Sequence, residues 1–431
     1  MHLLRKSQLF FILSFAGLIL VGAALLKGSL LLEGKGIHWI DALFMSTSAV
    51  CVTGLSTVNV SGFGYGTQGI LLLLMELGAL GVITLTSVII LLVRHEMNLD
   101  NKILVSGIIE SYSRREINKL LYVICLYTIA IEVFGAIFLA FGFWIEMKEP
   151  FGYAVYMGLF HAVSAFCNAG FSPYDDSLMR TGPLIKLGVA ALITFGGLGF
   201  YVIYDIGQML AHGTFMKIHS KIVLITSALV TLGGMAALKF CEFGEGGAIS
   251  WMDAFFQSVS ARTAGFNTID LAHLHPSSIM ILIVLMVIGA SPGSTGGGIK
   301  TTVFALIAVA TWKTFLGDRD IVMFNRRIPM TYVLKAFAIT FAYVAVALIG
   351  MVLLSIFEDF SYVSMLFESV SALGTVGLSL GVSGHSGIGG KLVLIALMYL
   401  GRVGPFTFFI FLLSREKSSR LRYPEERVIM G

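Results

Sequence analysis

Four glycines end four similar stretches of this chain, and their setting suggests that the backbone beside them binds a cation. Glycine adopts positive φ at little cost, so a chain can turn its carbonyl oxygens inward there. Four such turns around one axis predict a ring of backbone oxygens that replaces the hydration shell of an ion. Each glycine has a phenylalanine ten residues before it and a small residue five before it. In order, these trios are Phe44, Ala49 and Gly54; Phe160, Ala165 and Gly170; Phe255, Ser260 and Gly265; and Phe367, Ala372 and Gly377.

Side chains differ among the four predicted filter segments, so backbone oxygen is the chemistry that they share. Each segment follows about a dozen helix-forming residues, or roughly 18 Å of helix, which is too short to cross a bilayer core of about 30 Å. Each stretch is therefore expected to enter the membrane and turn back. The predicted filter segments are Cys51-Val52-Thr53-Gly54, Cys167-Asn168-Ala169-Gly170, Arg262-Thr263-Ala264-Gly265 and Gly374-Thr375-Val376-Gly377.

A glycine-rich sequence interrupts the apolar stretch 276–299 and predicts a gate. Pro292 and the glycines of 296–298 would break a helix. Unwound backbone at membrane depth is tolerated where it is buried or lines an aqueous cavity. A phosphate-binding loop is excluded, because Ile299 stands at the position of its lysine and no strand precedes it. The predicted gate comprises Ser291, Pro292, Gly293, Ser294, Thr295, Gly296, Gly297, Gly298, Lys300 and, from a second apolar stretch, Arg402.

Arg402 is expected to face the pore at the depth of this loop. A charge within a membrane span is costly and therefore faces the protein interior. There it would repel a passing cation, or hydrogen-bond carbonyls of the loop and hold a closed state. The structural alternative is an ion pair with Glu132 or Glu76.

Other features near the filter are expected to be structural. Arg262 is expected to point behind the filter toward Glu368 or Asp253, and His161 is expected to be packed rather than catalytic. Glycine tetrads at 78–81, 196–199 and 401–404 begin 24 or 26 residues after a filter glycine and predict close helix packing. Only the third repeat, at Gly289, is expected to have a broken helix.

The elements that position these residues are membrane spans. Hydrophobic residues make up 57% of the chain and charged residues 13%, which excludes an ordinary soluble domain. Eight apolar stretches fit spanning helices, two for each filter segment: 7–26, 77–93, 120–145, 187–204, 222–238, 276–299, 336–357 and 392–414. We expect an all-α membrane protein of four helix–pore-loop–helix repeats in fourfold pseudosymmetry around a central pore. The predicted repeats are residues 1–100, 101–212, 213–318 and 319–431, the last including a C-terminal cytosolic tail.

Basic residues predict the orientation in the lipid bilayer. Alternate connections hold nineteen Lys and Arg residues against seven on the other side, so both termini are expected in the cytoplasm. The net charge of +4 is therefore a topology signal and does not indicate nucleic-acid binding. The first apolar stretch is expected to be a retained helix rather than a signal peptide. The four cysteines show neither metal spacing nor a disulfide pattern.

These features together resemble the Trk/Ktr/HKT potassium-transporter superfamily. The resemblance rests on the four repeats, the filter glycines and the sequences 291–300 and 401–407. Within that superfamily the chain is most similar to the membrane subunits of bacterial Ktr systems (KtrB type). It lacks the additional N-terminal helices of the TrkH branch and ends in a short basic tail, 420–427. Cys51 and Cys167 depart from the hydroxyl or small polar residues that are common in the family.

The resemblance implies potassium uptake, commonly sodium-dependent, with potassium held at the backbone carbonyls of the filter segments. Gly54 favours potassium, because a serine at this position accompanies sodium permeation in plant relatives. The resemblance also implies a bacterial plasma-membrane protein, a homodimer with one pore per subunit, and a cytosolic nucleotide-binding regulatory ring of KtrA type. It implies no organic cofactor in this subunit.

Two other classes of protein fit less well. A secondary ion-coupled transporter with a broken-helix binding site would carry interruptions in pairs across inverted halves. Here one broken helix is expected among four copies of one topology. An intramembrane aspartyl protease is disfavoured, because Asp318 lies in a basic cytosolic segment and no paired carboxylates or nucleophile–base set is evident. The chain is therefore not expected to be an enzyme.

Overall fold

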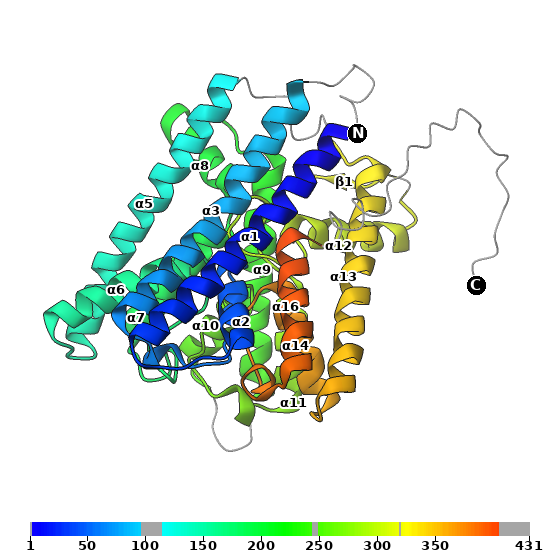
Figure 1. Cartoon of the computed structure of the whole chain (residues 1–431). Helices are drawn as coiled ribbons and strands as arrows, with labels where there is room; N and C mark the ends of the chain where they lie inside the picture. Colours follow the sequence, from blue (N-terminus) through cyan, green and yellow to red (C-terminus); the bar gives the residue numbers. More distant parts are fainter. Residues whose placement is uncertain (1, 96–113, 244–248, 319, 405–431) are drawn as a thin grey trace.

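The computed structural model describes residues 2–95, 114–243, 249–318 and 320–404, and the described part is almost entirely helical (Figure 1). Short elements are the 3-10 turns Val60–Gly62 and Leu271–His273 and an antiparallel hairpin of β1 (Val322–Met323) and β2 (Arg326–Arg327). The helices are α1 (His2–Leu32), α2 (Trp39–Val50), α3 (Tyr65–His95), α5 (Arg114–Ile145), α6 (Phe151–Phe166), α7 (Pro183–Gly197), α8 (Phe200–His212), α9 (Ile218–Cys241), α10 (Trp251–Ser260), α11 (Pro276–Val287), α12 (Thr301–Phe315), α13 (Met330–Phe357), α14 (Tyr362–Gly374), α15 (Val382–His385) and α16 (Ile388–Val403).

One unit, a long helix, a short pore helix and a second helix, recurs four times. The long helices α1, α5, α9 and α13 each contain a segment long and apolar enough to cross a membrane. Each packs against the pore helix that follows it (α2, α6, α10 or α14) and against the second helix of its own unit (α3, α7, α11 or α16). This arrangement confirms the predicted fold class. The pore helices α2 and α10 have 12 and 10 residues, so they cannot cross a bilayer.

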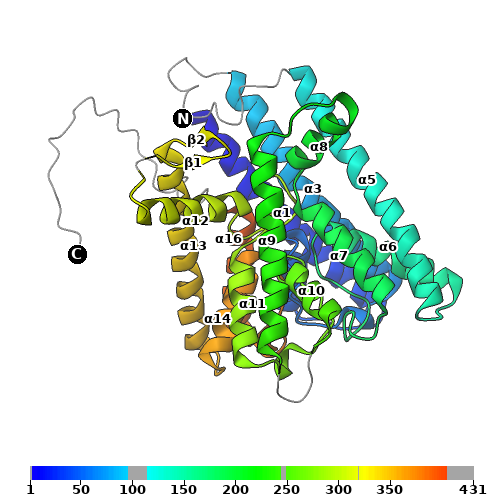
Figure 2. The same ribbon diagram turned by 180° about the vertical axis from the view of Figure 1, so that it is seen from behind.

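The two ends of the molecule carry different elements. The N-terminal end of α1, helix α8 and the β1–β2 hairpin lie at one end, and the turns from the long helices into the pore helices lie at the other (Figures 1 and 2). The basic β1–β2 hairpin and the α8–α9 connection thus lie at the same end of the molecule, and the predicted orientation in the bilayer stays a prediction. The predicted tail at 420–427 and the predicted repeat boundary near residue 101 lie outside the described residues.

The structure breaks two second helices where one was expected. The stretch 187–204 divides into α7 and α8, which are bent by 96°. Gly199, between them, has φ of 83°. The prediction of an intact helix through the tetrad 196–199 is therefore wrong. In the third repeat α11 ends at Val287 and α12 begins at Thr301, and α12 runs across α13 in both views (Figures 1 and 2).

Four glutamates that the sequence analysis missed tie each long helix to its second helix, at the end of the molecule opposite the β1–β2 hairpin. Each stands directly after the last residue of a long helix, where its charge opposes the helix dipole. Its carboxylate instead accepts hydrogen bonds from the N-terminus of the second helix, where negative charge is favourable. The pairs are Glu33 with the Gly64 amide and the Thr67 hydroxyl, Glu146 with the Leu184 and Ile185 amides, Glu242 with the His275 amide and the Ser278 hydroxyl, and Glu358 with the Gly387 amide.

Glu33 shows the electrostatic consequence of this arrangement. Hydrogen bonds from Thr67 and from the Gly64 amide lower the pKa of its carboxyl group. A lowered pKa in the folded state contributes stability at neutral pH, and that contribution is lost as the pH falls through the folded-state pKa.

We expect Glu146→Ala to lower the thermal stability of the purified protein in detergent. The substitution leaves two helix-start amides without their carboxylate, at 2.9 and 3.3 Å in the native structure, and such a cap is worth about 1 kcal/mol. The matched control Glu146→Gln keeps one acceptor oxygen and should lose less. Equal melting temperatures for the native protein and both variants would contradict the capping role.

Two ion pairs join neighbouring repeats at the same end. Asp253 Oδ1 in the first turn of α10 lies 2.7 Å from Lys186 Nζ on α7. Asp41 Oδ1 in the first turn of α2 lies 2.6 Å from Lys391 Nζ on α16. Both acids also suit the positive end of their pore helix. The pore helices of the first and third repeats are thereby fixed to the preceding repeat in the ring.

Candidate ion pathway

The four filter segments share one backbone geometry. Each filter glycine has positive φ: 98° at Gly54, 72° at Gly170, 80° at Gly265 and 96° at Gly377. The prediction that these positions need glycine is confirmed, because other residues adopt such angles only with strain. The residue two positions earlier also has positive φ in every segment, which the sequence did not indicate. These residues are Val52 at 56°, Asn168 at 61°, Thr263 at 81° and Thr375 at 49°.

The four glycines form a closed ring with the carbonyls of the residues before them. A Cβ atom added to any filter glycine would lie well within 3.0 Å of a carbonyl oxygen in the next segment, a distance that real Cβ atoms essentially never show. Each segment contacts the next one in sequence order, and the fourth contacts the first. The four segments therefore surround one axis. The contacts are Gly54 to Ala169 O, Gly170 to Ala264 O, Gly265 to Val376 O, and Gly377 to Thr53 O.

The third filter segment is one residue shorter than the others, which corrects the sequence alignment. Ala264 N donates to Ser260 O, four residues back, whereas the equivalent amides of Thr53, Ala169 and Val376 donate five residues back. The deletion shifts the third pore helix by one residue. Its fully buried phenylalanine is therefore Phe256, not Phe255. All four copies then share a serine and an alanine before the filter: Ser48 and Ala49, Ser164 and Ala165, Ser260 and Ala261, and Ser371 and Ala372.

A vestibule borders the ring of filter glycines. It is a cavity of about 370 Å³ that all four filter glycines line together with polar groups. Asn59, Asp175 and His385 are among those groups. Hydrated cations could therefore approach the ring through a polar space.

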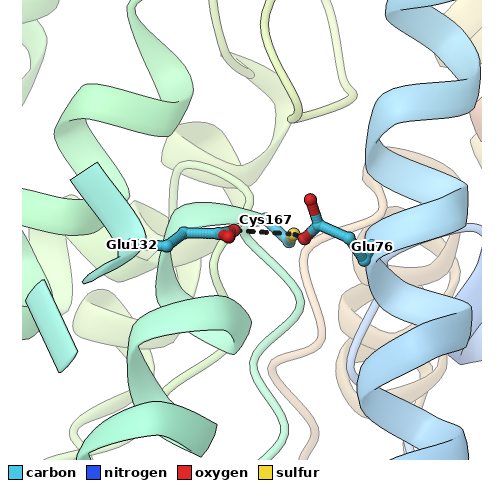
Figure 3. Close-up of side chains that lie close together, drawn as sticks. All are labelled: Glu76, Glu132 and Cys167. Atoms are coloured by element: carbon cyan, nitrogen blue, oxygen red, sulfur yellow. Dashed lines mark hydrogen bonds between the residues drawn. The ribbon is translucent and has the colours of Figure 1, made fainter. Parts of the chain in front are cut away.

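Cys167 belongs to the second filter segment, but its side chain points away from the ring. Its Sγ atom lies 3.2 Å from Glu76 Oε2 on α3 and 3.9 Å from Glu132 Oε1 on α5 (Figure 3). Within the described part of the chain neither carboxylate has a basic partner, so the alternative ion pair with Arg402 is not formed. The ligand atoms of Glu76, Glu132 and Cys167 lie within 4.8 Å of one another, which is close enough for the three side chains to hold a cation.

The predicted gate loop, Ser291–Lys300, lies directly against the filter segments. Added Cβ atoms at Gly296 and Gly297 would collide with the hydroxyl groups of Thr263 and Thr375. These two threonines are the residues two positions before filter glycines. The glycines of the loop therefore permit its close approach to the ring. Ser291, Ser294 and Thr295 are buried.

Arg402 holds the gate loop through backbone carbonyls. Its Nη1 donates to Thr295 O at 2.6 Å, and its Nη2 donates to Gly78 O at 2.8 Å. The side chain is 7% exposed. Of the two roles considered from the sequence, hydrogen bonding to the loop is thus present in the structure. Lys300 Nζ adds a bond to Gly296 O at 2.7 Å.

The gate loop is hydrogen-bonded to the backbone at the break between α7 and α8. The sequence analysis missed this role of the break. The amides of Ser291 and Thr295 donate to the carbonyls of Gly197 and Gly196, at 3.1 and 3.3 Å. In return, Phe200 N donates to Gly293 O at 3.1 Å. These bonds satisfy backbone groups that the two breaks leave open. The two broken helices therefore form one joint structure.

The three tetrads also pack closely, as predicted. An added Cβ at their first glycine would collide with the carbonyl of the residue four before the filter glycine of the same repeat. These contacts bring each second helix against the end of its pore helix. The pairs are Gly78 with Val50 O, Gly196 with Phe166 O, and Gly401 with Leu373 O.

Two further predictions concern Arg262 and His161. Arg262 lies behind the filter, but the predicted partners are wrong: its guanidinium donates to Ser227 O, Ser227 Oγ and Thr231 Oγ1 on α9. Asp253 is instead paired with Lys186, and Glu368 accepts from the Ser379 hydroxyl and the Ser383 amide. His161 is fully buried and bonded to Met157 O and Ser172 Oγ at 2.8 and 3.0 Å, which agrees with a packing role.

This geometry defines a helical membrane protein in which one chain supplies four pore loops around an axis. The family model described as "TrkH: Cation transport protein" matches residues 12–231 and 244–421. The chain therefore belongs to the TrkH family of cation transport proteins.

Individual relatives agree with this assignment. The chain is 36% identical to the Ktr system potassium uptake protein B of Vibrio alginolyticus, over 97% of this chain and 94% of that protein. It is 32% identical to the protein of the same name from Bacillus subtilis, over 96% and 94%. It is 34% identical to the potassium/sodium uptake protein NtpJ of Enterococcus hirae, over 96% and 95%. The crystal structure of the potassium transporter TrkH from Vibrio parahaemolyticus has the same fold, with a TM-score of 0.76, 22% identity, and coverage of 95% of this chain and 85% of that one.

Proposed function

We propose that this chain is the membrane subunit of a Ktr-type uptake system and moves potassium ions through the ring of filter segments. The observation that carries the proposal is the closed contact of each filter glycine with the carbonyl beside the next one. Carbonyl oxygens from four sides can replace the hydration shell of a monovalent cation. The names of the relatives supply the ion: potassium for the Ktr proteins, and potassium or sodium for NtpJ.

We assign gating to the loop 291–300 together with Arg402. The loop lies against the inner side of the ring, between the filter segments and the end of the molecule that carries the β1–β2 hairpin. Arg402 and the α7–α8 break hold it there through hydrogen bonds. Because its glycines have no side chains, the loop can move with little steric hindrance. The Arg402 guanidinium adds an electrostatic barrier to a passing cation.

A secondary ion-coupled transporter remains the second candidate. The observation in its favour is that two second helices are broken, not one. Such transporters place broken helices at a binding site near the midplane. Here the two breaks are hydrogen-bonded to each other and lie next to the ring of filter segments. This favours a single gate over a pair of half-sites that together bind a substrate.

The surroundings of the subunit follow the Ktr type. We place the chain in the bacterial plasma membrane with cytoplasmic termini, as a homodimer with one pore per subunit. Sodium is a second transported or coupling ion. We propose a nucleotide-binding cytosolic ring of KtrA type as the regulatory partner, which is what the resemblance to Ktr membrane subunits implies.

Purified chain in proteoliposomes should test both parts of this proposal. We expect a dimer that takes up potassium down an imposed gradient, measured by tracer or fluorescence flux, with rates that do not change on adding ATP or ADP. Empty liposomes provide the background. A lone monomer, or direct nucleotide control without a partner, would contradict the assembly, and absence of potassium flux would contradict the function.

A further inference from the structure

Arg262 carries a positive charge behind the third filter segment that no carboxylate neutralises within the described part of the chain. Its two Nη atoms donate to groups of α9: Ser227 O at 3.2 Å, Thr231 Oγ1 at 2.9 Å and Ser227 Oγ at 3.2 Å. The nearest expected acid, Asp253, is paired with Lys186. The Arg262 side chain is partly buried. A charge withdrawn from water without a counter-charge is costly, so a partner of opposite sign would stabilise this site.

Three hydrogen-bond donors at Arg262 have no acceptor among the residues that the structure describes. The first is Nε–H of the guanidinium, a buried atom without a partner. The others are the hydroxyl protons of Ser227 and Thr231. Because both hydroxyl oxygens accept bonds from Arg262, their own protons are left to be donated elsewhere. The group is therefore rich in donors and positively charged.

A small cavity lies beside these donors. Its volume is about 30 Å³, and Arg262, Ser227, Thr231 and Thr194 line it with apolar residues and Gly197. A volume of this order holds one water molecule or one small ion. No acidic side chain lines the cavity. Thr194 differs from the other hydroxyl residues, since its own proton is already donated to Ala190 O at 2.8 Å.

We propose that this cavity binds a small monovalent anion of the halide class, chloride in the cell. The anion would accept from Arg262 Nε, Ser227 Oγ and Thr231 Oγ1 and would neutralise the guanidinium. Arg262 immediately precedes Thr263, which lies between a filter glycine and the gate loop. This part of the inference rests on the proposed function: the bound anion raises potassium occupancy of the filter, because it cancels a positive charge that repels the potassium ion.

Bromide in place of chloride provides a test that does not depend on transport. Crystals grown in bromide should show an anomalous scattering peak within hydrogen-bonding distance of Arg262 Nε. Thr231→Val should remove or weaken the peak, whereas the matched control Thr194→Val should keep it, because that hydroxyl is already engaged. A water molecule without a bromide peak would overturn the site, whatever the protein transports.

Flux measurements then test the consequence. Replacing chloride by gluconate should lower potassium uptake in proteoliposomes several-fold for the native protein. Arg262→Gln should make uptake the same in both salts, and Thr231→Val should shift the half-saturating chloride concentration upward if Arg262→Gln does not fold. Equal native uptake in the two salts would overturn the regulatory effect, even with bromide bound.

Discussion

Replacing Gly54 with serine is expected to reduce the preference for potassium over sodium by roughly a hundredfold, which corresponds to about 3 kcal/mol. Gly54 has φ of 98°, and a Cβ atom there would collide with the carbonyl oxygen of Ala169. The added side chain must therefore push one of the four sides of the ring away from the axis. Potassium uptake in competition with increasing sodium measures the loss.

Gly62→Ser is the matched control for this substitution. A Cβ atom at Gly62 meets nothing within 4 Å, and this residue lies in the same connection between pore helix and second helix. The control should leave the competition curve unchanged. If Gly54→Ser in folded protein keeps both potassium affinity and selectivity, Gly54 does not line the ion-binding ring.

Replacing Arg402 with alanine is expected to raise the rate of potassium uptake about tenfold without a matching change in selectivity. The native side chain makes two charge-assisted hydrogen bonds that join the gate loop at Thr295 to α3 at Gly78. Such bonds are worth about 1.5–3 kcal/mol, so their loss shifts the loop toward open arrangements. Shortening the loop through Gly296–Gly298 should act in the same direction.

Arg402→Lys separates the two contributions of the arginine. Lysine keeps the charge but cannot form the planar two-pronged contact. Uptake as slow as the native protein would assign the barrier to charge, and uptake as fast as Arg402→Ala would assign it to the two carbonyl contacts. Unchanged rates in Arg402→Ala and in the shortened loop would remove the gate assignment. Lost selectivity at an unchanged rate would place these residues in the filter.

The fold and the filter geometry could be predicted because both depend on local sequence. Four apolar stretches long enough to span recur before four short helices, and each filter glycine is required by the angles at its own residue. The shorter length of the third filter segment was harder to predict from the sequence. Phe255 and Phe256 are adjacent, so either could be aligned with the other copies until the hydrogen bond from Ala264 to Ser260 fixed the register.

The features that sequence reasoning missed involve contacts between distant segments. The backbone beside the break at Gly199 is hydrogen-bonded to a loop about a hundred residues later in the chain. Without knowledge of that contact, the sequence of the tetrad 196–199 is equally compatible with a motif for close helix packing. The four glutamates that follow the long helices bond to residues 29 to 39 positions later, beyond a pore loop. Their placement directly after each long helix was the available signal, because an acid is unfavourable there unless it has another partner.

The most direct test of the central claim is to locate the bound ion itself. Crystals of the purified chain grown with rubidium or thallium in place of potassium should show an anomalous peak on the axis of the ring. The account predicts that peak at the level of the carbonyl oxygens of Thr53, Ala169, Ala264 and Val376. A ring without a peak, with the ion instead between Glu76 and Glu132 beside Cys167, would contradict it.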